Sequence, residues 1–183
     1  PGLKLSAART NAVFFLDFVD QWDPKSPWHD QRVRLAASLA IDRKAINEAE
    51  QLGFAGLTGN IVPHHMEFAL PITPHPYDPA RARQLMAEAG YSKGFDAGDI
   101  SPNPPYFTLA EAVAANLGAV GIRVKVRSME RAAWLTAWRE KKLKGVVLGA
   151  QGGGGNAATR IEGLATKDGM FAYGVLPEVE DLF

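Results

Sequence analysis

The chain has 183 residues, of which 46% are hydrophobic, and this length supports one domain with a buried core. The 20 Lys and Arg residues balance the 20 Asp and Glu residues, which excludes a strongly basic surface that recruits nucleic acid or an anionic membrane. There is no cysteine, which excludes disulfides, thiol nucleophiles and thiolate metal sites, and no run approaches the ~20 apolar residues of a membrane span.

The N-terminal part of the chain predicts one strand and two helices in tandem. Residues 12–19 are rich in Val and Phe and are typical of a mostly buried strand. Asp30 is a favourable N-cap for a first helix, and Asp42 for a second helix that ends at Gly53. The apolar positions that we expect to face the core are Val33, Ala36, Ala37 and Ala40 in the first helix, and Ala45, Ala49 and Leu52 in the second.

The middle of the chain alternates irregular segments with a third helix. Residues 54–76 contain several glycines and prolines and predict a long segment without helices or strands. Asp78 and Pro79 are typical of the N-cap and first position of a helix, which ends at Gly90. Residues 91–106 predict a second irregular segment. The positions of the third helix that we expect to face the core are Ala82, Leu85, Met86 and Ala89.

The remaining pattern alternates helices with strands. Thr108 and Glu111 form a capping box for a helix that ends at Gly121, and residues 122–126 alternate apolar and basic side chains as a strand does. Ser128 is the expected N-cap of a helix that continues to about Lys142, with Leu135 and Trp138 facing inward.

A continuous apolar run at residues 145–150 is typical of a central parallel strand. A glycine run at 152–155, a short helix at about 157–165 and the start of a last helix at 175–178 follow. Because helices and strands alternate without a visible boundary, we expect a single α/β domain over residues 1–183.

Three stretches carry a resemblance to a known family. They are SPWHDQRVRLAASLAIDRKAI at 26–46, the run from Tyr77-Asp78-Pro79 through AEAGY to Gly94-Phe95, and residues 117–126. In this order and spacing they resemble family 5 extracellular solute-binding proteins, the peptide, nickel and opine receptors of ABC importers. Three ordered matches are far more specific than any one of them.

The resemblance implies a fold and a role. Family members are longer, exported and built as two lobes around a cleft, so we expect residues 1–183 to be a fragment that resembles the C-terminal lobe, without the first lobe and signal peptide. The expected fold is one lobe of a type II periplasmic-binding-protein-like fold, with a mixed sheet flanked by helices. The implied function is non-enzymatic capture of a solute in the periplasm and delivery to a membrane permease of the ABC type, without cofactor or nucleic acid.

The strand, loop and helix from Val146 to Leu164 are the strongest candidate for a site. Ligands of open α/β sheets bind outside the carboxyl ends of the strands, near helix N-termini. In the resembling family this loop contributes to the cleft, often with an aromatic residue and an Asp-Pro pair, and both are missing here. Peptide specificity is therefore not carried over, and a glycine connection that binds no ligand stays open as an alternative. The expected ligand-binding residues are Trp22, Trp28, Gln151, Gly152, Gly153, Asn156 and Arg160.

Other functions have less support. Gly152, Gly154 and Ala157 loosely match the dinucleotide fingerprint of an oxidoreductase, which needs an acid such as Glu178 at the end of a second strand. A sensor module of a regulator is a further alternative. The pair His64-His65 raises metal binding, but adjacent side chains of an extended segment point to opposite faces, so we expect no metal site there.

Overall fold

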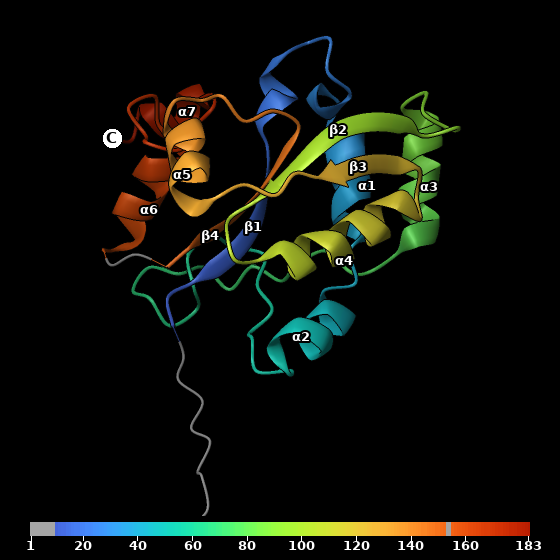
Figure 1. The fold of residues 1–183 in the computed structure, drawn as a ribbon. Coiled ribbons are helices and arrows are strands. Elements are labelled where there is room, and N and C mark those ends of the chain that lie inside the picture. The colour runs from blue at the N-terminus through green and yellow to red at the C-terminus, as the bar shows by residue number, and fades with distance from the viewer. Residues whose placement is uncertain (1–9, 153–154) are drawn as a thin grey trace, which may run out of the picture.

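Four strands form one mixed sheet in the spatial order β1–β4–β2–β3 (Figure 1). The computed structural model describes residues 10–152 and 155–183. Strands β4 (Val146–Gln151) and β3 (Ile122–Val126) both run parallel to β2 (Phe95–Pro102), whereas β1 (Val13–Phe18) is antiparallel to β4. This mixed sheet, connected by helices, confirms the predicted α/β class.

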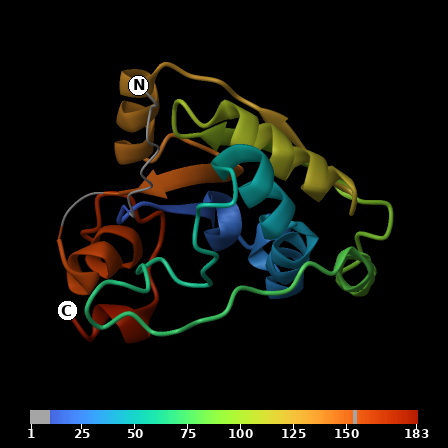
Figure 2. The ribbon, with the colours of Figure 1, turned by 90° about the horizontal axis from the view of Figure 1, so that it is seen from below.

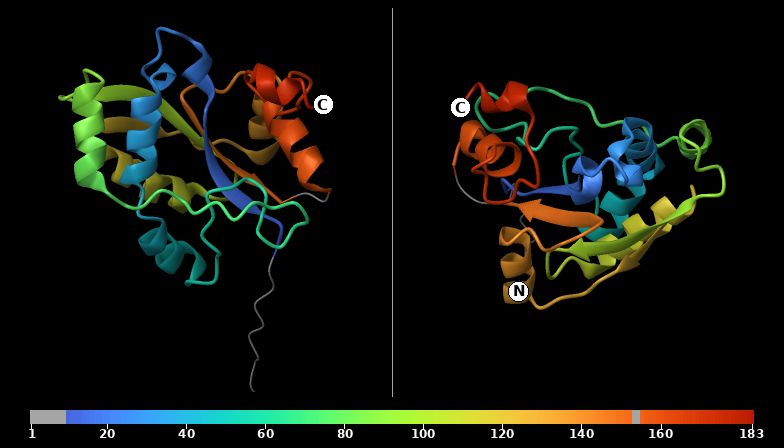
Figure 3. Two further views of the ribbon diagram at one scale, coloured as in Figure 1. Left: turned by 180° about the vertical axis from the view of Figure 1, so that it is seen from behind. Right: turned by 90° about the horizontal axis from the view of Figure 1, so that it is seen from above.

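The larger hydrophobic core lies between the sheet and helices α1 (Gln31–Ala40), α3 (Pro79–Glu88) and α4 (Phe107–Gly118). These helices lie together on one side of the molecule (Figures 1 and 3). The predicted apolar stripe of α1 is at most 1% exposed, which confirms the periodicity. The sheet residues that belong to this core include Ile100, Val146 and Leu148.

A smaller core covers the opposite face of the sheet. It lies under helix α5 (Arg131–Arg139) and the C-terminal part of the chain, which includes α6 (Ala157–Ala165) and α7 (Pro177–Glu180). Alternation along a strand sends neighbouring side chains to opposite faces, so Val147 belongs here while its neighbours face the larger core. The buried residues of this second core are Val19, Trp134, Trp138, Leu143 and Val147.

Strand β2 is the element that the sequence pattern failed to predict, because residues 91–106 were expected to be irregular. The strand contains Gly98 and Pro102 and no β-branched residue except Ile100, so its intrinsic strand propensity is low. It forms because β3 and β4 pair with it on its two sides, despite a break in register between Asp96 and Asp99. Tertiary pairing therefore overrides local preference in the middle of the sheet.

Two helix starts also differ from the prediction. Helix α4 begins one residue before Thr108, whose hydroxyl donates a 2.6 Å hydrogen bond to Glu50 Oε2 and does not cap the helix. Helix α5 begins after Glu130 and ends before the expected Lys142; the N-cap is Glu130, not Ser128. Two backbone N–H groups of the first turn donate to the Glu130 carboxylate and lower its pKa.

Helix α2 (Arg43–Gln51) begins as predicted, but the residues that were expected to face the core are exposed to solvent. The Asp42 side chain accepts from Ala45 N, which confirms the predicted N-cap, and Leu52 ends the helix in the left-handed conformation with φ 53°. However, Ala45 and Ala49 are exposed and Leu52 is 75% exposed, so the predicted core stripe is wrong. No residue of α2 is buried in the described structure.

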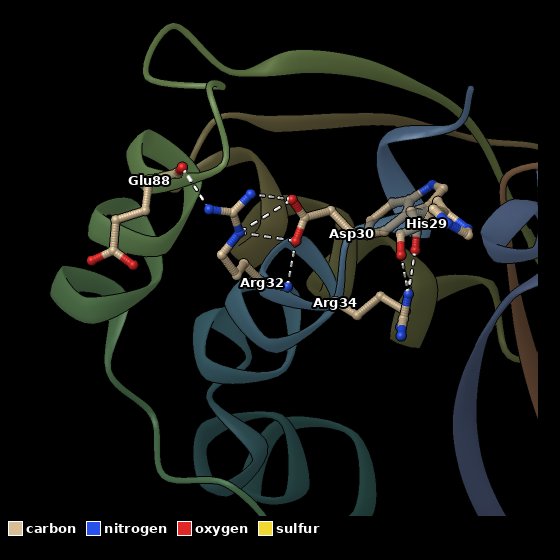
Figure 4. A network of polar contacts seen from close by, with 6 residues as sticks. His29, Asp30, Arg32, Arg34 and Glu88 are labelled. Carbon is tan, nitrogen blue, oxygen red and sulfur yellow. Dashed lines mark hydrogen bonds and ion pairs between the residues drawn. The ribbon is translucent and has the colours of Figure 1, made fainter. Parts of the chain in front are cut away.

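The Asp-x-Arg-Val-Arg run that carries much of the family resemblance has a structural role (Figure 4). Asp30 caps α1 and pairs with Arg32, 2.6 Å from Nη2 to Oδ2, and this hydrogen bond lowers the pKa of the Asp30 carboxyl. Arg32 also donates to the carbonyl oxygen of Glu88 at the end of α3. Arg34 donates to the carbonyl oxygens of residues 28–29. The run thus joins α1 to α3 and to the preceding turn.

Candidate functional site

The parallel strands β2 and β4 end side by side, and polar residues follow both of them. Pro102 pairs with Leu148, so Asn103 and Gln151 lie at the same carboxyl edge of the sheet. Asn103 N donates to Leu148 O over 2.8 Å, and its Nδ2 lies 3.4 Å from Ala150 O. In open α/β sheets this edge is where ligands bind.

Two buried side-chain oxygens at this edge have no hydrogen-bond partner within the described chain, namely Asn103 Oδ1 and Gln151 Oε1. Buried polar atoms are normally satisfied, so each oxygen has acceptor capacity that no described residue uses. Gln151 was predicted as a site residue, whereas Asn103 was missed because it fell in the segment expected to be irregular. The one sequence signal for Asn103 is its position between Pro102 and Pro104.

The start of α6 supplies the next two predicted residues. Asn156 is the N-cap of α6, and its side-chain oxygen accepts from Thr159 N over 3.0 Å, so this oxygen is already engaged. Gly152 packs against Ala12, where an added Cβ would lie 3.2 Å from Ala12 Cβ. Gly153 lies outside the described residues.

Arg160 is buried at this edge, and both of its terminal nitrogens bond within the chain, whereas its Nε is buried without a partner among the described residues. It is 2% exposed, and its guanidinium donates to the backbone carbonyls of Asn11, Ile61 and Gln151. Burial lowers the pKa of Arg160. The structure therefore assigns Arg160 a bonding role within the chain rather than the predicted direct contact.

Trp22 lies at the opposite end of the sheet from Gln151. It follows β1 in a 3₁₀ turn (Val19–Trp22), and the antiparallel register pairs Val13 with Gln151 and Phe18 with Val146. The length of β4, about 17 Å at ~3.4 Å per residue, separates the two ends. Trp22 is 40% exposed and lies over Gly174, so it does not join the edge residues in one site.

Trp28 is a core residue. It lies in the turn Pro27–His29, is 1% exposed and stacks on Phe18 with ring centroids 4.4 Å apart, while Phe95 packs edge-on against it. The predicted cleft role of Trp28 is contradicted, because aromatic rings that bury large areas stabilise the core and are not accessible to a solute.

An irregular segment, 52–77, runs from α2 past α6 to the start of α3 (Figure 2), which confirms the irregular stretch predicted at 54–76. Two shallow hollows of about 190 and 200 Å³ lie along it and share Leu57 and Pro74. Neither hollow is lined by Gln151, Asn156 or Arg160, and both are smaller than the usual ~300 Å³ or more of a ligand pocket. The strongly exposed apolar residues of the segment are Leu52, Phe54, Leu57, Phe68, Leu70, Ile72 and Tyr77.

The remaining possibilities from the sequence find no support in residues 10–152 and 155–183. These residues contain no cluster of three His, Asp or Glu side chains that could hold a metal ion. Glu178, the acid that a dinucleotide site would need at a strand end, lies exposed in α7. None of the described helices combines the length and apolar character of a membrane span.

Curated relatives share recognisable sequence with this chain. It is 32% identical over 139 residues to heme-binding protein A of Haemophilus influenzae, covering 72% of this chain and 25% of that protein. It is also 32% identical over 109 residues to the glutathione-binding protein GsiB of Escherichia coli K12, covering 58% of this chain and 21% of that protein. The chain therefore spans about a quarter of the length of these relatives.

Solved structures share the fold. HbpA2 from Haemophilus parasuis matches with a TM-score of 0.81 at 21% identity, covering 95% of this chain and 36% of that one. The periplasmic binding protein DppA from Helicobacter pylori, in complex with the peptide STSA, matches with a TM-score of 0.79 at 22% identity, covering 93% and 34%. These similarities confirm the type II periplasmic-binding-protein-like fold.

The family assignment comes from the sequence as a whole. Residues 1–172 match the family described as bacterial extracellular solute-binding proteins, family 5 Middle, which is nearly the entire chain. With this match and the shared fold, the chain belongs to the family 5 bacterial extracellular solute-binding proteins.

Proposed function

We propose that this chain is part of the solute-binding receptor of an ABC importer. The observation that carries the proposal is the family match over residues 1–172. The complete protein is exported, closes two lobes around a solute and delivers it to a membrane permease. Its role is binding, not catalysis, and residues 1–183 correspond to the second lobe.

Within this chain, the carboxyl edge of β2 and β4 is the part of the lobe that contacts the solute. Asn103 and Gln151 each hold a buried side-chain oxygen without a partner among the described residues, and the solute contacts this edge through these two side chains, directly or through a bound water. The named relatives bind heme and glutathione, and one structural neighbour holds a peptide. The solute is therefore a small organic molecule of this size range, and peptide specificity is not part of the proposal.

Isothermal titration calorimetry of the complete receptor with hemin, reduced glutathione and trialanine tests the proposal. We expect at least one probe to bind with a dissociation constant of about 1 μM or tighter. Residues 1–183 alone hold only one side of the cleft, so they should bind that probe roughly 100-fold more weakly or not at all. Equal affinity of the isolated chain and the complete receptor would contradict a two-lobe mechanism.

Substitutions at the edge locate the site. Asn103→Ala and Gln151→Ala should each weaken the probe's affinity about tenfold, because each removes one buried acceptor from the contact. Gln84→Ala, on the exposed surface of α3, is the control and should leave affinity unchanged. Unchanged affinity in both edge variants would move the site away from this part of the fold.

A further inference from the structure

Three segments that are far apart in the sequence meet at one side chain, Arg160 on α6. Its Nη1 donates to Ile61 O and to Gln151 O, each over 3.2 Å, and its Nη2 donates to Asn11 O. Asn11 precedes β1, Ile61 lies in the irregular segment and Gln151 ends β4. A single guanidinium therefore joins the start of β1, the segment 52–77 and the end of β4 to α6.

The chemistry of the guanidinium suits this arrangement. It presents several N–H donors in a rigid planar fork, so it can satisfy carbonyl oxygens that come from different directions. Among the ion pairs of the described residues none involves Arg160, so carbonyl dipoles, not a carboxylate, solvate its buried charge. Burying a charge in this way is costly unless its partners are held in place, which ties the positions of the three segments to one another.

Other arginines among the described residues reach backbone carbonyls that are nearer in sequence, and the longest of these spans is the 56 residues from Arg32 to Glu88. Arg34 donates to the carbonyls of residues 28–29, immediately before its own helix. The contacts of Arg160 instead span 149 residues to Asn11 and 99 residues to Ile61. A side-chain contact also links the segment 52–77 to the start of β1, since His65 Nε2 lies 2.6 Å from Asn11 Oδ1.

We propose that Arg160 is a positioning residue for the solute-binding edge. It fixes the end of β4 and the start of α6 against the start of β1 and the segment 52–77, and so places Gln151 for contact with a solute. Arg160 does not touch the solute itself. The link between Arg160 and solute binding rests on the proposed function. The positioning of the three segments does not, because it is a property of this chain without any ligand.

Hydrogen–deuterium exchange of residues 1–183 without ligand tests the positioning. In Arg160→Met, which keeps an unbranched apolar chain but no donor, amides near Asn11, Ile61 and Gln151 should exchange roughly tenfold faster or more, because all three carbonyl anchors are lost. Amides of β3 and α4 should keep their rates. Arg160→Lys keeps the charge but not the fork and should restore protection only in part.

The control is Arg34→Met, which also removes a guanidinium that donates to backbone carbonyls, those of residues 28–29. This variant should speed amide exchange only around residues 28–33. Wild-type rates at all three segments in Arg160→Met would overturn the proposal. A uniform rise across every element would also overturn it, because that indicates loss of global stability without local positioning. Wild-type exchange rates in Arg160→Lys would show that a positive charge alone suffices, and would refute the role of the planar guanidinium.

The purpose of the positioning is tested separately in the complete receptor. Arg160→Met should weaken binding of the probe that the wild-type receptor binds, and Arg160→Lys should weaken it less. If the exchange result holds and affinity is unchanged, the link to the solute site is wrong. If the wild-type receptor binds none of the three probes, the proposed function fails while the exchange result still decides the positioning.

Discussion

Asp17 in β1 offers a sharp test of how burial sets the pH dependence of stability. Strand alternation places its side chain on the same face of β1 as Phe15, which packs against the smaller core. Burial raises the pKa of Asp17 from 3.8 to about 6, an effect that the charge of nearby Lys141 opposes. A folded-state pKa above the unfolded value means that the folded chain holds this proton more tightly. The free energy of unfolding contributed by Asp17 therefore rises as pH falls from about 7 through 6 towards 4.

The magnitude follows from the size of the pKa change. A difference of about two pH units at ~1.36 kcal/mol each gives an order-of-magnitude cost of about 3 kcal/mol for the ionised form at pH 7.5. Asp17→Asn removes the charge but keeps the shape. We therefore expect the variant to be more stable than the wild type at pH 7.5 by up to about 3 kcal/mol, with the difference closing near pH 4.

Urea unfolding at pH 7.5 and 4.5, followed by tryptophan fluorescence, measures this difference. The signal is suitable because Trp134 and Trp138 lie in the smaller core, on the side of the sheet that Asp17 faces. Carboxyls such as Asp30, whose pKa is lowered, affect both proteins equally and cancel in the comparison. Asp168→Asn at an exposed carboxyl is the control for the substitution itself. A variant that is less stable at pH 7.5, or a stability difference that does not change with pH, would refute the reasoning.

Two further substitutions test local features of the fold by the same unfolding measurement. Gly94→Ala should lower the free energy of unfolding by about 3 kcal/mol or more, because Gly94 has φ 70° and an added Cβ collides with the Gly121 backbone. Its control, Gly90→Ala, has φ 90° but open space around the added Cβ and should lower it by only about 1 kcal/mol. Equal losses in the two variants would contradict the steric argument. Asp30→Ala should cost about 1–2 kcal/mol by removing the cap of α1 and the partner of Arg32. A loss no greater than that of a simple surface substitution, below about 0.5 kcal/mol, would show that this cap is dispensable.

Local chemistry made much of the fold predictable. The N-caps Asp30, Asp42 and Asp78 are confirmed because a short acceptor side chain satisfies the free N–H groups of the residues that directly follow it. The strand at 122–126 is confirmed because its alternation reflects one buried and one exposed face. The family resemblance rests on such segments, and the network around Arg32 shows that their polar residues hold helices together.

The candidate site was predictable only in part, because it depends on the ends of strands that are distant in sequence. Gln151 was found because it directly follows a recognisable apolar strand. Asn103 was missed because β2 has low strand propensity and exists through pairing with two other strands. Trp22 and Trp28 have a residue type that is common in ligand clefts, but strand register places Trp22 at the far end of the sheet and packing buries Trp28.

The sequence by itself determined the aspartate N-caps of α1, α2 and α3, most strands, the α/β class and the family, since each depends on neighbouring residues or on an ordered set of local motifs. Tertiary structure alone decided three things: the central place of β2, the outward face of α2, and the meeting of three segments at Arg160. The physical reason is that backbone pairing and burial depend on which segments become neighbours in space. A donor such as the Arg160 guanidinium is assigned to its carbonyls only when those segments have come together.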